Sequence, residues 1–205
     1  MKIISAKGVS AISKLSRAYI RSFALSPEKN AREFFDCISD LYTTPEVQSL
    51  QQYEQHLQIN RLDHIRSVSY ISYLVCKKLG LNYREAARGA ILHDLFYYDW
   101  RDKYSHPRPH GYLHPGIALK NARELCGEKL TRLEANTIKR HMFPLTPIPP
   151  RYPEGLVVSM ADKYCASWEL YLSLIPAGKR MLAALAGHSD PGKGPDAGRP
   201  GRETT

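Results

Sequence analysis

The sequence predicts an all-α protein, and three observations support this prediction. Apolar residues recur at helical spacing along most of the chain, and no segment shows the sustained apolar–polar alternation of a β-strand. Prolines and glycines fall mainly between the periodic segments. Apolar residues make up 43% and charged residues 24% of the 205 residues, which excludes a collagen-like, coiled-coil or wholly disordered chain. We expect a single bundle of about six or seven helices.

The first 30 residues form a basic N-terminal arm. Residues 1–30 carry six lysines and arginines but one acid, Glu28, whereas residues 31–175 are nearly neutral. Apolar side chains of the arm share one helical face: Ile4, Ile12, Leu15, Tyr19 and Phe23. This pattern favours an amphipathic helix that packs on the body, and the alternatives are a membrane-surface or partner-binding helix and a poorly ordered leader. Because the body is nearly neutral, we expect no specific nucleic-acid binding.

The body, residues 31–175, is expected to be one domain. Its periodic segments predict helices over Pro27–Leu41, Pro45–His56, Leu62–Leu79, Tyr83–Tyr98, His114–Leu125, Lys129–Met142 and Glu154–Leu174. Thr44 precedes Pro45 as a helix N-cap, and Gly80 ends a helix as a C′ glycine.

Three segments lack this periodicity. Residues 99–113 predict a loop that is long for a compact domain, and residues 144–155 are rich in proline, which is typical of an extended connection. Residues 176–205 predict a disordered Gly/Pro-rich tail.

The cysteines and the hydropathy indicate a cytoplasmic protein. The four cysteines form no CxxC pair, and three of them lie in apolar helical segments, where buried free thiols are common. A reducing compartment is therefore expected. No stretch approaches the ~18 uncharged apolar residues of a membrane helix, so we expect no transmembrane segment.

Ionisable side chains interrupt three apolar helical segments. His64 lies in one, the adjacent His93 and Asp94 follow another, and Asp162 lies in a third. A buried carboxylate without a partner costs several kcal/mol, and a shared divalent cation would remove that cost. Imidazole and carboxylate ligands suit Fe, Mn, Zn, Co or Ni rather than Ca. The alternatives are a core histidine and an aspartate that caps a helix or pairs with a cation.

The same residues carry a resemblance to a known family. RLDHIRSVSYIS, AILHDLF and VVSMADKYCA contain His64, the His93-Asp94 doublet and Asp162 in the order found in the HD-domain superfamily of metal-dependent phosphohydrolases. The resemblance covers about residues 45–175. The segments YDWR, HGYLHP, KRHMFPLT and PPRYPE are similar to those of small, stand-alone bacterial HD-domain proteins.

The resemblance implies a metal site and its ligands. The first metal would be held by His64, His93, Asp94 and Asp162, and His114 and His141 match the two extra histidines of two-metal members. We therefore expect two ions bridged by Asp94, with a single ion as the alternative. His110 is the alternative to His114.

The expected function is hydrolysis of a phosphate ester. Two cations would bridge a water and lower its pKa, so that a metal-bound hydroxide attacks phosphorus. Asp94 would orient that water, and Lys163 would either contact the phosphate or pair with a neighbouring acid. Arg61, which shares a helix face with His64, and His110 are further substrate-binding candidates. The 99–113 loop is then a substrate lid, or else a surface loop.

The substrate class stays broad. Relatives that hydrolyse cyclic di-GMP carry Gly-Tyr-Pro where this chain has Arg151-Tyr152-Pro153. We therefore expect a phosphomonoesterase or phosphodiesterase for a nucleotide or another small phosphorylated molecule. The alternatives are a metal- or nucleotide-binding regulatory module without turnover and an accessory protein tethered by its basic arm.

Overall fold

The computed structural model describes residues 14–28, 31–56, 59–102, 104 and 106–188. Within these ranges the chain forms nine α-helices, two 3-10 turns and one two-stranded ribbon, which confirms the all-α prediction. The count exceeds the expected six or seven helices because further helices form in the arm, at residues 14–22, and beyond residue 175. None of the helices in the described ranges has the length and apolar character that crossing a bilayer requires.

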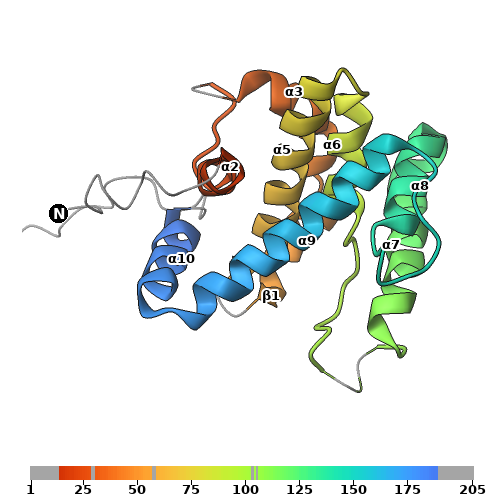
Figure 1. Ribbon diagram of the computed structural model, residues 1–205. Coiled ribbons are helices and arrows are strands. Elements are labelled where there is room, and N and C mark those ends of the chain that lie inside the picture. Colours follow the sequence, from red (N-terminus) through yellow and green to blue (C-terminus); the bar gives the residue numbers. More distant parts are fainter. Residues whose placement is uncertain (1–13, 29–30, 57–58, 103, 105, 189–205) are drawn as a thin grey trace, which may run out of the picture.

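Helices α5 (Arg61–Leu79) and α6 (Tyr83–Leu92) form the centre of the bundle, and α9 (Pro153–Leu174) packs against both (Figure 1). The side chain of Asn60 accepts a hydrogen bond from the backbone N–H of Asp63 and so begins α5. Gly80 ends α5 with a φ of 69°, the left-handed conformation expected of a C′ glycine.

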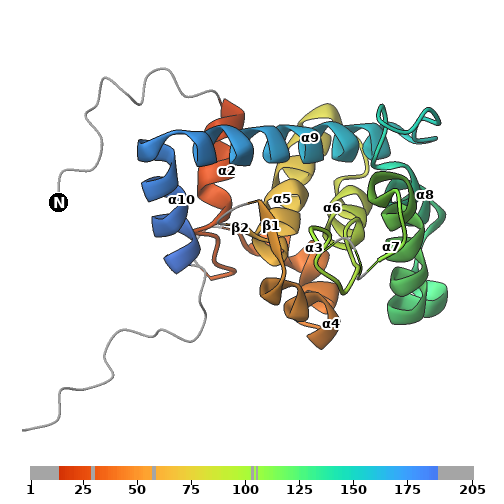
Figure 2. The same ribbon diagram turned by 90° about the horizontal axis from the view of Figure 1, so that it is seen from below.

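The other helices surround this centre. The ends of the bundle are formed by α2 (Lys14–Ser22) and α10 (Pro176–His188) on one side and by α7 (His110–Cys126) and α8 (Arg132–Arg140) on the other (Figure 2). The remaining elements are α3 (Arg32–Tyr42), α4 (Pro45–Gln48), the 3-10 turns η1 (Ser49–Gln52) and η2 (Gly127–Lys129), and the strands β1 (Glu54–His56) and β2 (Ile59–Asn60).

A close helix contact sets the spacing of the interior. A Cβ atom on Gly89 of α6 would lie 3.1 Å from Cγ2 of Thr137 in α8, so the glycine allows the two helices to approach closely. Both helices end in buried histidines, His93 after α6 and His141 after α8. The contact therefore brings two polar helix ends together inside the bundle.

The predicted helix over residues 45–56 is wrong in its second half. The helix stops at Gln48, and after the turn η1 the chain forms β1, which pairs antiparallel with β2. The segment is polar and has no apolar face to bury as a helix. Tertiary contacts decide its structure, because Gln55 of β1 is buried against α5 and the residues after α6.

The boundaries of four other helices also differ from prediction. Helix α3 begins at Arg32 rather than Pro27, and α8 begins at Arg132 rather than Lys129. Helix α7 begins at His110 rather than His114, so Pro115 lies inside it, and the preceding loop is one turn shorter than expected. Helix α6 ends at Leu92 rather than Tyr98, because the backbone carbonyls of Phe96 and Tyr98 accept hydrogen bonds from Arg61 instead of continuing a helix.

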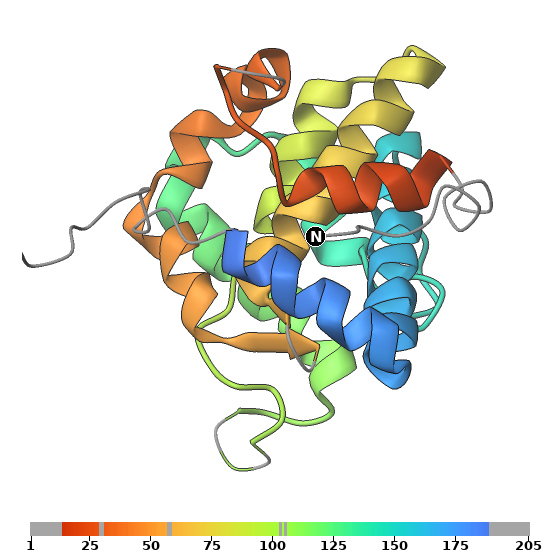
Figure 3. The same ribbon diagram turned by 90° about the vertical axis from the view of Figure 1, so that its left-hand side faces the viewer.

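The predicted disordered tail is wrong for its first part. Residues Pro176–His188 form α10, which packs on α9 and buries Leu182 completely. The composition of the tail misled the prediction, because its few apolar residues are concentrated in these first turns. Residues 189–205 lie outside the described residues, as do residues 1–13 of the arm. The described part of the arm, residues 14–28, contains α2, which packs on α5 (Figure 3). Tyr19 of this helix and Phe23 directly after it are buried.

Candidate metal centre

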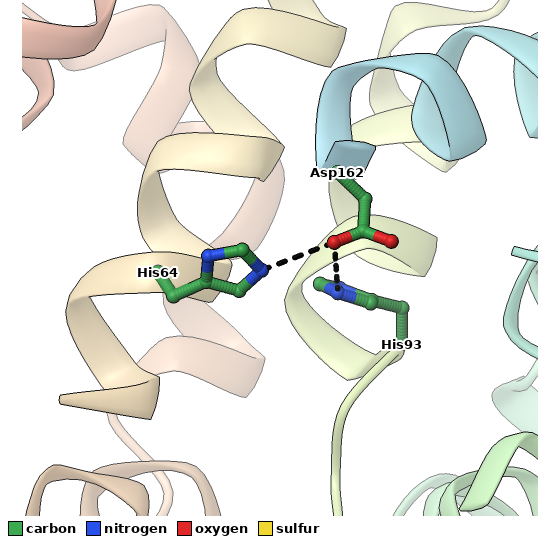
Figure 4. A group of neighbouring side chains, drawn as sticks. All are labelled: His64, His93 and Asp162. Atoms are coloured by element: carbon green, nitrogen blue, oxygen red, sulfur yellow. Dashed lines mark hydrogen bonds and ion pairs between the residues drawn. The ribbon is translucent and has the colours of Figure 1, made fainter. Parts of the chain in front are cut away.

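His64 lies in the second turn of α5, fully buried. Its Nδ1 is 3.1 Å from both carboxylate oxygens of Glu169, and its Nε2 is 3.2 Å from Oδ1 of Asp162 in α9. Figure 4 shows the imidazoles of His64 and His93 directed at the same carboxylate oxygen of Asp162. Three helix segments that are distant in the sequence therefore meet at this carboxylate.

The His93 ring is oriented by its own helix. Its Nδ1 is 2.7 Å from the carbonyl oxygen of Ala90 and must donate a proton, because a carbonyl oxygen only accepts. In the neutral ring Nε2 then carries a lone pair. This Nε2 is buried without a hydrogen-bond partner, 3.6 Å from Oδ2 of Asp94 and 3.7 Å from Oδ1 of Asp162.

Asp94 presents one oxygen to the interior of the site. Its Oδ2 accepts a hydrogen bond of 3.0 Å from Nε2 of Gln55. Its Oδ1 is buried without a hydrogen bond and lies 3.3 Å from Nε2 of His114 and 3.5 Å from Nε2 of His141. A buried carboxylate oxygen without a hydrogen bond is costly, and a positive charge between this oxygen and the two imidazoles would stabilise it.

His114 and His141 complete this half of the site. Their Nδ1 atoms lie 3.0 Å from the carbonyl oxygen of His110 and 2.8 Å from that of Ile138, so both Nδ1 atoms are donors. Their Nε2 atoms are only 2.9 Å apart. In the neutral rings both of these atoms carry lone pairs, which repel one another unless a proton or a metal ion lies between or beside them. The arrangement fits a metal ion.

The ligand atoms form two overlapping groups. His64, His93 and Asp162 form the first and His93, Asp94 and His141 the second, and the ligand atoms within each group lie within 4.8 Å of one another. His114 adjoins the second group through Asp94 and His141. Imidazole nitrogens and carboxylate oxygens in these proportions suit Fe, Mn, Zn, Co or Ni.

The carboxylates of the site are held in their charged forms. Burial alone would raise the pKa of Asp94, but the neighbouring His93 and His114 outweigh it and hold this pKa well below its usual value. The hydrogen bond from His64 and the neighbouring His93 likewise outweigh burial and lower the pKa of Asp162. Burial, together with the adjacent histidines, lowers the pKa of His141 and keeps it neutral. Ionised carboxylates and neutral imidazoles are the forms that bind a metal.

His64 and His93 show where the site requires positive charge. Burial would lower the pKa of His64 and His93, but the carboxylates beside them raise both values, chiefly Glu169 at His64 and Asp94 at His93. The negative charge of the site thus draws protons onto these rings. A divalent cation would supply the same positive charge and leave the imidazoles as neutral ligands.

A pocket opens onto these ligands. It has a volume of about 260 Å³ and is lined by Asp94, His114, His141 and Asp162 at its base. Trp100, His110, Met142 and Leu145 form much of its apolar wall. The segment between the doublet and α7 therefore borders the pocket through Trp100.

Lys163 lies at the pocket wall and is partly exposed. Its ammonium group donates to Oδ2 of Asp162 at 2.9 Å and to the carbonyl oxygen of His141 at 2.6 Å. Ser159 donates to the same carbonyl at 2.6 Å. Lys163 thus pairs with a neighbouring acid, which is the second of its two predicted roles. Lys163 also lines the pocket.

Arg61 does not lie where the predicted substrate contact would require it. Its guanidinium is fully buried and donates to Oε1 of Gln55 and to the carbonyl oxygens of Phe96 and Tyr98, at 3.0, 2.7 and 3.1 Å. It lies 3.7 Å from the centre of the Phe96 ring. Arg61 shares a helix face with His64, but this face points inward, so the side chain holds the segment after the doublet and does not line the pocket.

Two residues of the site escaped the sequence analysis. Gln55 bridges Arg61 and Asp94, and Glu169 contacts His64. Gln55 lies in a polar segment without periodicity, so the sequence carried no signal for it. Glu169 lies seven residues after Asp162, on the same face of a helix, and this spacing is a signal that could have identified it.

His110 occupies the first position of α7, beside the pocket. Its ring stacks on His114 and on Trp100, with centroid distances of 4.5 and 6.0 Å. Burial and, next, the neighbouring His114 lower the pKa of His110 to about 4. The ring is therefore uncharged near neutral pH and provides a flat apolar wall.

We expect the His110 imidazole to titrate near pH 4 in an NMR experiment. Its folded pKa lies below the usual value of about 6.5, so the unfolded chain binds a proton that the folded chain does not as the pH falls from about 6.5 to 4. Stability should fall across this range, and by less in His110→Gln than in the wild type. A titration midpoint near pH 6.5 would contradict the prediction.

The comparisons with known proteins agree with this geometry. The sequence model described as HD domain matches residues 61–167, just over half of the chain. This range begins at α5 and ends within α9, so it includes all six predicted ligands. No curated protein and no solved structure matches the chain. By its match to the family and by its His–Asp cluster, the chain belongs to the HD-domain family.

Proposed function

We propose that this protein is a metal-dependent phosphohydrolase that acts on a nucleotide or another small phosphate ester, as a phosphomonoesterase or phosphodiesterase. The observation that carries the proposal is the convergence of four imidazole Nε2 atoms and two carboxylates in one buried cluster, of which Asp94, His114, His141 and Asp162 line a pocket. Metal-dependent phosphate hydrolysis is the chemistry that the HD-domain family suggests. The pocket volume of about 260 Å³ favours a small substrate.

Two ions fit the donor set best. His64, His93 and Asp162 would hold one ion, and His114 and His141 the other, with Asp94 shared between them. When bound, such ions supply Lewis acidity and a water of lowered pKa.

The side chains around the ligands would orient the reactants. Gln55 holds Oδ2 of Asp94, so that Oδ1 faces the ligand cluster and is placed to orient the attacking water. Lys163 would add positive charge where charge develops on the phosphoryl oxygens. Trp100 and His110 at the wall would flank the leaving group and limit the access of water, which strengthens electrostatic interactions inside the pocket.

Elemental analysis combined with a phosphoesterase screen tests the proposal. The wild type, purified without added metal or a histidine tag, should contain about two equivalents of transition metal, the number expected of a two-metal site. His141→Ala should contain fewer and should lose turnover. Glu124→Gln, which removes an exposed carboxylate on α7, is the control and should match the wild type.

Two results would overturn the proposal in different ways. Absence of bound metal after reconstitution with Mn, Fe, Zn, Co or Ni would exclude the metal site. Bound metal without turnover of mononucleotides, cyclic nucleotides or p-nitrophenyl esters would instead favour the regulatory binding module.

A further inference from the structure

Glu169 is a buried carboxylate that belongs to no metal-ligand group described above. It lies in α9, and its exposure is 0%. Both of its carboxylate oxygens lie 3.1 Å from Nδ1 of His64, on the side of the ring opposite Asp162. Burial of a carboxylate is costly unless it is paired, so this pairing is a strong restraint on the His64 ring.

Tyr19 extends the contact to the N-terminal helix. Its hydroxyl donates to Oε1 of Glu169 at 3.3 Å, and the residue is completely buried. Burial and the nearby Glu169 carboxylate raise the pKa of Tyr19, so the hydroxyl keeps its proton and serves as a donor. Three side chains therefore form a line from α2 through α9 to a predicted metal ligand on α5.

Hydrogen bonds join α2 to α5 and α9, the helices that carry His64 and Asp162 of the first ligand group. Oγ of Ser22 lies 2.7 Å from Oγ of Ser67, three residues after His64, and Oγ of Ser16 lies 2.8 Å from the hydroxyl of Tyr164, two residues after Asp162. Figures 1 and 3 show α2 crossing beside α5. Helix α2 is therefore part of the packing around the candidate metal centre.

We propose that Glu169 and Tyr19 are positioning residues for His64, so that docking of α2 and binding of metal strengthen one another. The inference rests on the proposed function only in that His64 is a metal ligand. A carboxylate on Nδ1 fixes the tautomer that leaves Nε2 for the metal, turns the ring and raises its basicity. Because binding free energies are linked reciprocally, a change that loosens α2 must then weaken metal binding, and bound metal must stabilise α2.

A cobalt titration of the full chain tests this inference. Glu169→Gln keeps the size of the side chain but loses its charge, and it should weaken Co²⁺ binding by about 10–100-fold and shift the visible absorption of the bound ion. Glu154→Gln is the matched control, because Glu154 is also buried in α9 but accepts a hydrogen bond from the backbone N–H of Asn82. It should bind Co²⁺ as the wild type does.

Tyr19→Phe tests the contribution of α2 without changing the charge. It removes one hydroxyl and should weaken Co²⁺ binding by a smaller factor than Glu169→Gln, with an unchanged circular dichroism spectrum. Wild-type affinity in a folded Glu169→Gln protein would overturn the inference, and if that variant does not fold, wild-type affinity in Tyr19→Phe would overturn it. A wild type that binds Co²⁺ but hydrolyses no ester would overturn the proposed function alone.

Discussion

Replacement of Asp94 by asparagine should lower kcat/KM by about 10³-fold or more and remove most of the bound metal. The change leaves the size of the side chain intact, but it removes the charge that the two ions would share. Loss of such a contact costs several kcal/mol of transition-state stabilisation, and each 1.4 kcal/mol corresponds to a factor of ten in rate. The effect should be the largest of any single substitution at the site.

The geometry explains why asparagine should be inert rather than weakly active. Oδ2 of Asp94 accepts a hydrogen bond from Gln55, and Oδ1 faces the Nε2 atoms of His114 and His141. The asparagine amide can accept from Gln55 with its oxygen and donate to the imidazole lone pairs with its nitrogen. The variant therefore satisfies these polar partners without a metal.

Steady-state kinetics and elemental analysis of one preparation measure both effects. Asp99→Asn is the control, because Asp99 lies in the same connection but pairs with Arg101 at the surface. It should keep the metal content and the kcat/KM of the wild type. Full metal content in Asp94→Asn would contradict the predicted ligand role of Asp94.

Replacement of Arg61 by methionine should lower the free energy of unfolding by about 3–5 kcal/mol. The substitution leaves three acceptors without their donor, namely the buried Oε1 of Gln55, the buried carbonyl of Phe96 and the half-buried carbonyl of Tyr98. Each orphaned buried group costs about 1–3 kcal/mol. It also removes a cation from the face of Phe96. Burial lowers the pKa of Arg61 to about 10, so the guanidinium is charged at neutral pH.

Urea unfolding at neutral pH measures the loss. Arg84→Met is the matched control, since Arg84 is exposed at the start of α6 and should change stability by less than about 0.5 kcal/mol. A loss below about 1 kcal/mol in Arg61→Met would show that Gln55 and the two carbonyls find other hydrogen-bond partners, such as water. The substitution should also weaken metal binding. Gln55 holds Asp94, and it would lose its own hydrogen bond from Arg61.

The helices that carry the site could be predicted because their signals are local. The periodic apolar residues of α5 and α9 and the glycine Gly80 each act within a few residues of the element that they define. The candidate ligands could also be identified, since an ionisable residue within an apolar segment is visible in the sequence. The resemblance to the HD-domain family supplied their common role.

The remaining features depend on contacts between distant segments. Gln55 reaches Asp94 across 39 residues, and Tyr19 reaches Glu169 across 150, so neither contact leaves a pattern in the sequence. The inward orientation of Arg61 follows from acceptors supplied by Phe96 and Tyr98, 35 and 37 residues away. The same reason explains the ribbon formed by β1 and β2, where a polar segment is ordered by its neighbours.

The hydrogen bonds from ring Nδ1 atoms to nearby carbonyls have a consequence for folding. His93, His114 and His141 each donate to a residue three or four positions earlier in the chain. Each ring is thus ordered by its own helical turn, and the loss of side-chain conformational entropy occurs as that turn forms. The three nitrogens are then preorganised before any ion arrives, so that little of the binding free energy is spent on ordering ligands.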